Sequence, residues 1–130
     1  PLKGLDLAIE RGYKNIAITL LPSPLIRQIR KLDLPEDVNV YLFIAHTTGV
    51  SKEQAEEIFK YADIITACCS KYIREQAEIV KAPYYGKIVS IYAGSEIGRK
   101  FLDERLKLLD KPLSTTDYPQ DNSMFPRPLI

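Results

Sequence analysis

Few residues of this chain could carry out chemistry. His46 is the single histidine, and the two cysteines, Cys68 and Cys69, are adjacent in the sequence. An imidazole can act as a base or a metal ligand near neutral pH. A cysteine that lies between a strand and the start of a helix, beside Lys71, has surroundings that favour a nucleophilic or metal-binding thiolate. These residues are therefore the first candidates for a functional site.

Each candidate also has a structural interpretation, which the sequence leaves open. The histidine ring can be satisfied by loop backbone, and cysteine often packs as a small buried hydrophobe. If a strand runs through Cys68 and Cys69, their side chains alternate, so at most one of them faces a crevice. His46 and one cysteine supply two metal ligands, whereas zinc usually takes three or four. We therefore assign no metal and no cofactor, and keep these three residues as metal candidates that need further ligands from elsewhere.

Helices and strands that would position these residues alternate along the chain. Apolar residues at helical spacing follow serines or prolines that can begin a helix, and Ser51 with Gln54 forms a predicted capping box. Short apolar runs rich in β-branched residues predict buried strands. The predicted helices cover residues 2–11, 24–32, 52–61, 71–80 and 95–108, and the predicted strands cover residues 14–21, 38–45, 63–69 and 87–93.

This alternation predicts an α/β fold of three layers, with an open sheet of about four parallel strands and helices on both faces, Rossmann-like or flavodoxin-like. Residues 1–109 are expected to form this single domain. Residues 110–130 are rich in proline and are predicted to form an extended tail. Because the tail also carries many apolar residues, we expect it to pack on the domain or on a partner subunit, with a frayed tail as the alternative.

The predicted site lies at the carboxyl ends of the strands, where loops and the first turns of the following helices meet in an open parallel sheet. Small residues and hydroxyl groups at these positions leave backbone amides able to bind an anion or a polar head group. The candidate ligand-binding residues are Ser23 after the first strand, His46, Thr47, Thr48 and Gly49 after the second, Cys68, Cys69, Ser70 and Lys71 after the third, and Gly94 and Ser95 after the fourth.

Composition and motifs argue against several function classes. With 18 basic and 17 acidic side chains the net charge is +1, which gives no electrostatic attraction for nucleic acid or anionic membranes. No apolar run approaches the roughly 20 residues that span a bilayer. The glycine pattern of dinucleotide-binding loops and the Walker A motif are both missing. The two adjacent cysteines do not suit a disulfide scaffold, so we expect a protein of the reducing cytoplasm.

Three function classes remain open. The first is a binding domain that uses the loops around His46 and Cys68 to hold a small ligand, a metal or a cofactor precursor. The second is a transferase-type enzyme that holds an anionic substrate at the amino ends of helices. The third is a structural or interaction subunit, a homo-oligomer or the partner of another protein, in which the tail packs on a second chain.

Three stretches of the sequence also resemble a known family. They are "LDLAIERGYKNIAIT", "AHTTGVSKEQAEEIFKYADIITACCSKYIRE" and the closing "PRPLI". They are similar to methanogenesis marker protein 8, an uncharacterised archaeal family of methane-producing organisms. The resemblance implies a cytoplasmic archaeal protein with methanogenesis-related partners, acting in the maturation or support of cofactor-dependent enzymes. It also implies that these residues are part of a longer polypeptide, and it assigns no catalytic residue.

Overall fold

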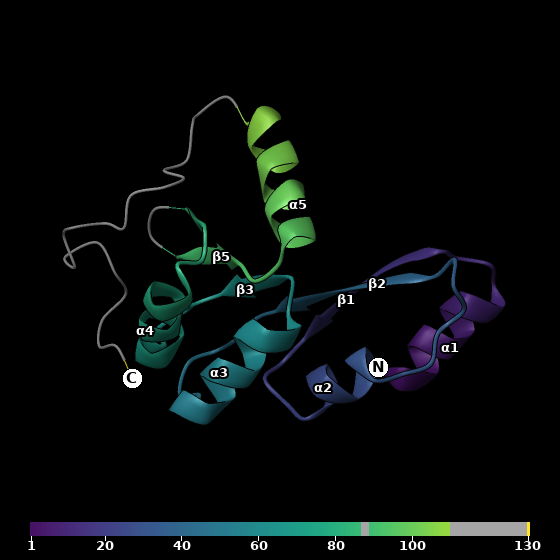
Figure 1. Cartoon of the computed structure of the whole chain (residues 1–130), viewed down its shortest axis with the longest axis horizontal. Helices are drawn as coiled ribbons and strands as arrows, with labels where there is room; N and C mark the ends of the chain where they lie inside the picture. Colours follow the sequence, from purple (N-terminus) through teal and green to yellow (C-terminus); the bar gives the residue numbers. More distant parts are fainter. Residues whose placement is uncertain (87–88, 110–129) are drawn as a thin grey trace.

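A five-stranded sheet with helices packed against it forms the centre of the computed structural model, which describes residues 1–86, 89–109 and 130 (Figure 1). The helices among these residues are α1 (Leu2–Glu10), α2 (Leu25–Arg30), α3 (Lys52–Tyr61), α4 (Lys71–Val80) and α5 (Glu96–Lys107). The strands are β1 (Asn15–Leu20), β2 (Asn39–Ile44), β3 (Ile64–Thr66), β4 (Tyr84–Tyr85) and β5 (Ile91–Ala93).

The sheet is mixed, and this corrects the prediction of about four parallel strands. The strand order is β1-β2-β3-β5-β4, and only β1, β2 and β3 run parallel to one another in consecutive positions. β5 pairs antiparallel with β3, and β4 pairs antiparallel with β5. β4 runs in the same direction as β3, because both are antiparallel to β5. The connection from β4 to β5 is short and can link antiparallel neighbours but not parallel ones, so β5, which lies between β3 and β4, runs against both. The fold is therefore α/β with a parallel half and an antiparallel half.

One face of the sheet carries most of the core. Val40, Leu42 and Ile44 of β2 are buried on this face, and α2, α3 and α4 pack side by side against it. Leu5 of α1 joins the same hydrophobic cluster. Burial alternates along β2, so one face of the strand packs against this helical layer, as expected for a strand with a period of two.

The opposite face is covered by α5 alone among the described helices. Phe101 of α5 packs edge-on against Tyr41 and Phe43 of β2, at ring-centre distances of 4.9 and 6.1 Å. Tyr85 of β4 donates a hydrogen bond of 2.7 Å to Asp103 of α5. The second helical layer therefore covers only part of the sheet, and a complete three-layer arrangement is not what the described residues form.

Local signals correctly predicted several helix ends. The capping box of Ser51 and Gln54 is present at α3, and Ser70 and Ser95 cap α4 and α5 through their hydroxyl groups. Helix α2 differs, because Pro24 rather than Ser23 occupies its cap position and no side chain caps it.

Strand predictions were less accurate than helix predictions. β3 ends at Thr66, three residues before the predicted end at residue 69, and the short strand β4 was predicted as a turn. The predicted tail lies outside the described residues except for Ile130. Within the described part of the chain, no helix has the length and apolar character that a membrane crossing requires.

Candidate functional site at the carboxyl edge

Three loops follow the parallel strands and lie at one edge of the sheet, which we call the carboxyl edge. They are the β1–α2 loop (residues 21–24), the β2–α3 loop (residues 45–51) and the β3–α4 loop (residues 67–70). Because β1, β2 and β3 are adjacent and parallel, these loops are neighbours in space. The structure therefore brings together the candidates Ser23, His46–Gly49 and Cys68–Lys71 at one edge.

Two side-chain hydrogen bonds join the β2–α3 loop to the β3 end of the sheet. The Thr47 hydroxyl is fully buried and donates to the carbonyl oxygen of Thr66 at 2.7 Å. The Thr48 hydroxyl accepts from the amide of Cys69 at 3.2 Å. These threonines were candidates as ligand-binding groups; the structure gives both of them contacts that hold the two loops together.

Both loops contain a residue in the left-handed backbone region. His46 has φ 56° and Cys68 has φ 46°, and Gly49 in the same loop as His46 has φ 79°. A non-glycine residue in this region costs roughly 1–2 kcal/mol, so it persists only where the surroundings enforce it. His46 is exposed, and the next residue, Thr47, is held in place by its hydrogen bond to Thr66. Strained residues of this kind gather at binding and catalytic sites more often than elsewhere.

The cysteines lie in a turn, so the condition on which the alternation of their side chains depended is not met. β3 ends before them, so Cys68 and Cys69 are not consecutive strand residues with opposite directions. Both thiols are free and half-buried. Beneath the turn, the buried guanidinium of Arg74 donates to the carbonyl oxygens of Ser70 at 2.8 Å and Cys68 at 2.7 Å. The turn is therefore held in place by a buried cation from α4.

Ile130 also contacts this turn through its backbone. Its amide donates to the carbonyl oxygen of Cys69 at 2.9 Å, and its carbonyl oxygen accepts from the amide of Lys71 at 3.0 Å. The first amide of α4 is thus paired with Ile130, while the Ser70 hydroxyl accepts from the amide of Ile73 at 3.2 Å. A ligand at this edge would meet side chains and the remaining loop backbone rather than these two amides of α4.

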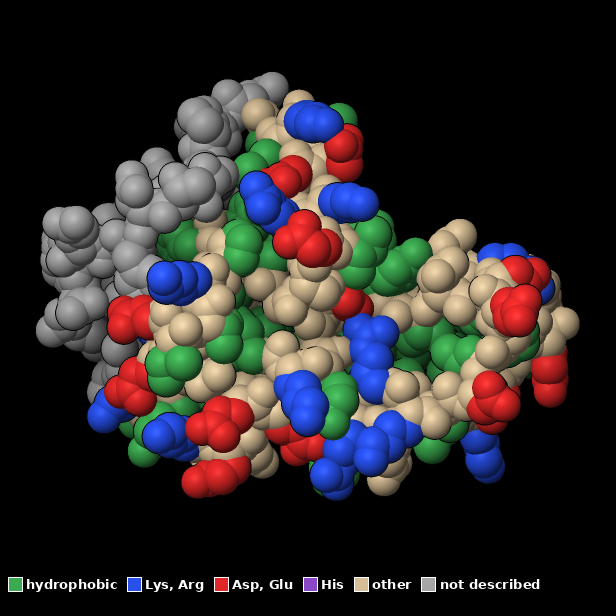
Figure 2. Space-filling view, in the orientation of Figure 1, with side chains coloured by type: hydrophobic (Ala, Val, Ile, Leu, Met, Phe, Trp, Pro, Cys, Tyr) green, Lys and Arg blue, Asp and Glu red, His purple; other side chains and the backbone are tan. Residues whose placement is uncertain are grey.

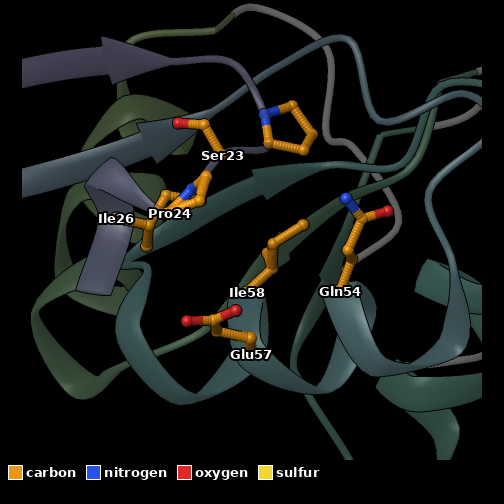
Figure 3. Close-up of a pocket in the computed structure, with 7 residues that line it drawn as sticks. Ser23, Pro24, Ile26, Gln54, Glu57 and Ile58 are labelled. Atoms are coloured by element: carbon orange, nitrogen blue, oxygen red, sulfur yellow. The ribbon is translucent and has the colours of Figure 1, made fainter. Parts of the chain in front are cut away.

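A pocket of about 210 Å³ lies between the β1–α2 loop and α3 (Figure 3). Ser23 and Pro24 form one wall, and Gln54 and Glu57 of α3 form the other. The Glu57 carboxylate forms an ion pair of 3.4 Å with Arg27, and its buried oxygen receives no hydrogen bond from the described residues. Gln54 lines the pocket and also accepts from the Ser51 amide at 2.8 Å, so the pocket wall is continuous with the loop that carries His46.

Gly94 and Ser95 do not join this site. β5 runs antiparallel to β3, so its carboxyl end lies at the opposite edge of the sheet, beside Asp63. Ser95 donates to the Asp63 carboxylate at 2.6 Å, and the Gly94 amide donates to the Asp63 carbonyl oxygen at 2.9 Å. Both residues line a separate pocket of about 480 Å³ there, together with Lys81, Glu96 and other residues of α4 and α5. The prediction that all four strand ends share one crevice is therefore wrong for the fourth.

Asp63 and Arg30 form the centre of this opposite edge, which we call the amino edge, and the sequence did not single them out. Asp63 is buried and accepts from the Arg30 guanidinium, from the Leu42 amide at 2.8 Å and from Ser95. Arg30 also donates to the carbonyl oxygens of Tyr61 and Val40, each at 2.7 Å. Every polar group of this pair is engaged, which is the pattern of a structural ion pair.

The cavities at the amino edge are larger than the one at the carboxyl edge, but they are weaker candidates for a ligand-binding site. A pocket of about 440 Å³ lies beside Arg30, Asp63 and Tyr41. Its buried polar groups are already engaged with one another, so they have little capacity left for a ligand. Among the described residues no group of three or more His, Cys, Asp and Glu side chains could hold a metal ion. His46, Cys68 and Cys69 would need ligands from other parts of a protein to bind one.

The fold and this edge define an α/β domain with a loop-built candidate site at the ends of three parallel strands. The chain belongs to an archaeal family, since residues 1–107 match the family model described as "Uncharacterized protein conserved in archaea (DUF2099)". It is similar to "Uncharacterized protein MJ0054" of Methanocaldococcus jannaschii, with 38% identity over 129 residues. The match covers 98% of this chain and 45% of that relative, so the chain spans less than half of the relative's length. A comparison with solved structures gives no match.

Proposed function

We propose that this chain is a binding domain for a small polar ligand, and that the carboxyl edge of β1, β2 and β3 is its site. The observation that carries the proposal is the pair of left-handed residues, His46 and Cys68, on adjacent loops that the Thr48 contact with Cys69 joins. A protein that needed only a tight turn could use glycine at both positions without strain. Two non-glycine residues with a strained backbone, at the edge where α/β sheets bind ligands, favour a role in binding.

The arrangement offers a ligand both polar and apolar contacts. The exposed imidazole of His46 can donate or accept a hydrogen bond, and the half-buried thiols supply soft, polarisable atoms. The neighbouring pocket has Gln54 and Glu57 on one side and Ile58 at its floor. A site of this composition suits a small molecule with a polar group near His46 and a short apolar part in the pocket.

Thermal unfolding with and without ligand probes tests the binding role. The probes are inorganic phosphate, Zn²⁺ and a library of small polar fragments, each added to the full chain. A bound probe at 100 times its dissociation constant stabilises the folded state by about 2.7 kcal/mol. Thr48→Ala removes the contact that joins the loops, so we expect it to weaken binding about tenfold. Thr19→Ala, an exposed threonine on β1, is the matched control and should leave binding unchanged. Failure of all probes to stabilise the chain, or equal effects of the two substitutions, would contradict the proposal.

Reactivity of the thiols tests their part in the site separately. Iodoacetamide alkylates a thiolate sulfur with loss of iodide, and peptide mass spectrometry distinguishes Cys68 from Cys69. If a thiol belongs to the site, the probe that stabilises the chain should slow its alkylation at least fivefold. Alkylation at the same rate with and without that probe would remove the thiols from the site and leave His46 and the pocket.

We also propose a biological setting for the binding role. The resemblance to methanogenesis marker protein 8 and the relationship to a Methanocaldococcus protein support a role in methane-producing archaea. There the domain would hold a ligand during the maturation or support of a cofactor-dependent enzyme. Deletion of the family member in a methanogen tests this setting: growth by methane formation should slow, and normal growth and methane output would contradict it.

A further inference from the structure

Of the described helices, only α5 reaches the face of β1 and β2 that points away from the helical layer, and it covers only part of that face. Residue pairs on this face are Asn15 with Asn39, Ala17 with Tyr41 and Thr19 with Phe43, as the strand register gives them. The three β1 residues are exposed, and Tyr41 and Phe43 are half-buried where α5 reaches them through Phe101. We call the six paired residues the open face.

The open face has the chemistry of a packing surface. None of its six residues is charged, and it combines two aromatic rings with small and amide side chains. Tyr13 and Leu21, at the two ends of β1, each have 60% of their surface exposed. In the view of Figure 2, hydrophobic side chains gather in the hollow between α5 and the lobe that contains β1 and β2. Nucleic acid or a charged metabolite would require charged groups that this face does not offer.

The edge of β1 adds to this incomplete covering. β1 is the first strand in the sheet order, so its outer edge has no strand partner among the described residues. Natural proteins usually cover or blunt such an edge, because its free backbone groups invite pairing with another chain. Four described helices lie over the other face and only α5 over this one, so the part of the second layer over β1 and β2 is missing from this chain's described residues.

We propose that the open face is an interface for the part of the family's polypeptide that lies outside the matched region. The curated relative matches nearly all of this chain with 45% of its own length, so more than half of its residues belong to that further part. In the full polypeptide those residues belong to the same chain as the matched part, and the open face is uncharged and next to a strand edge that has no strand partner among the described residues. This inference is independent of the proposed ligand site, which lies at the carboxyl edge.

Binding between separate polypeptides tests the interface. The part of the Methanocaldococcus jannaschii relative outside the match is expressed alone and titrated into this full chain, with binding measured by calorimetry. The relative's own matched part, expressed separately, is titrated in the same way, because it has the natural sequence on both sides of the proposed contact. Ala17→Arg and Thr19→Arg place a charge on exposed positions of the open face, so each should weaken binding at least tenfold while the melting temperature stays unchanged. Gln28→Arg, on an exposed position of α2, is the matched control and should have no effect.

Three results would overturn the proposal. The first is the absence of association in both pairs of polypeptides. The second is association that Ala17→Arg and Gln28→Arg weaken equally, because the contact would then lie elsewhere. The third is a stable dimer of this chain alone, seen by light scattering and dissociated by Ala17→Arg, because a second copy would then occupy the open face.

Discussion

The two edges of the sheet are built on opposite principles. At the amino edge, Asp63, Arg30 and Ser95 are engaged with one another and with backbone groups. At the carboxyl edge, His46 and Cys68 have strained backbone conformations. The imidazole on these loops is exposed, and the two thiols are half-buried. A satisfied and buried network supplies stability, whereas backbone strain is found more often at functional sites than elsewhere. The amino edge therefore helps to hold the domain together, and the carboxyl edge is the edge that we propose as the binding site.

The largest expected effect is at the amino edge, from Asp63→Ala. This substitution removes the carboxylate that Arg30, the Leu42 amide and Ser95 share, and it leaves the guanidinium without its counter-ion. Breaking a buried pair in this way costs about 3 kcal/mol or more, so urea unfolding should show a loss of that size. Asp37→Ala is the matched control, because Asp37 pairs with Lys14 at 2.8 Å on the surface, and it should unfold like the unsubstituted chain. Similar unfolding of both variants would contradict the structural role of Asp63.

A glycine at the same edge gives the next largest effect. A Cβ atom at Gly98 would overlap the carbonyl oxygen of Asp63, which is backbone and cannot move aside easily. Gly98→Ala should therefore push α5 from the sheet and destabilise the chain by about 1–3 kcal/mol. Gly4→Ala in α1 meets no atom within 4 Å and should raise stability by up to about 1 kcal/mol. Unfolding curves that move in the same direction for the two variants would contradict the close packing of α5 on Asp63.

Substitution by glycine at the strained positions of the carboxyl edge should increase stability, the opposite of the effect expected for Gly98→Ala. His46→Gly and Cys68→Gly relieve the left-handed strain, and each should stabilise the chain by up to about 1 kcal/mol. The same changes should weaken binding of the stabilising probe at least tenfold. Lys81 at the end of α4 is also left-handed, with φ 53°, so Lys81→Gly is the control that should gain stability without a change in binding. If all three variants bind equally well, the strain at His46 and Cys68 has no functional role.

The smallest expected effect on stability comes from the hydrogen bond between Tyr85 of β4 and Asp103, which is a further contact between α5 and the sheet. Burial raises the pKa of Tyr85 to about 12, and its hydrogen bond to Asp103 acts in the same direction. The folded state therefore keeps the proton to higher pH than the unfolded chain, whose tyrosine titrates near about 10. The stability contributed by the neutral phenol is complete below pH 10 and is lost as the pH rises toward 12. Tyr85→Phe should flatten this part of the pH dependence of unfolding, and an unchanged slope would show that Tyr85 does not cause it.

Local sequence signals predicted the helices well, because their information lies within a few residues. The capping box of Ser51 and Gln54 and the serine caps of α4 and α5 depend on residues three positions apart. Strand direction depends on distant pairing, so the antiparallel run of β5 and its consequence for Gly94 and Ser95 were not predictable from the same signals. β4 has only two residues and carries almost no periodicity.

The candidate site was predicted in part for the same reason. The ends of β1, β2 and β3 follow from consecutive parallel strands, so Ser23, the His46 loop and the Cys68 loop share an edge as expected. The partners of Asp63 lie 33 and 32 residues away in Arg30 and Ser95, and no short pattern connects them. The left-handed backbone at His46 and Cys68 was not predicted, because neither residue is the glycine or asparagine that most often adopts this conformation.

The most direct measurement compares the two edges in one experiment. Backbone amide resonances of the full chain are assigned by NMR, and the probe that gives the largest thermal stabilisation is titrated in. We expect the chemical-shift changes to be concentrated at residues 45–50 and 67–71 of the carboxyl edge, while the amides of Asp63, Ser95 and Gly98 change little. Changes concentrated at the amino edge, or no saturable change at either edge, would contradict the assignment of the carboxyl edge as the binding site.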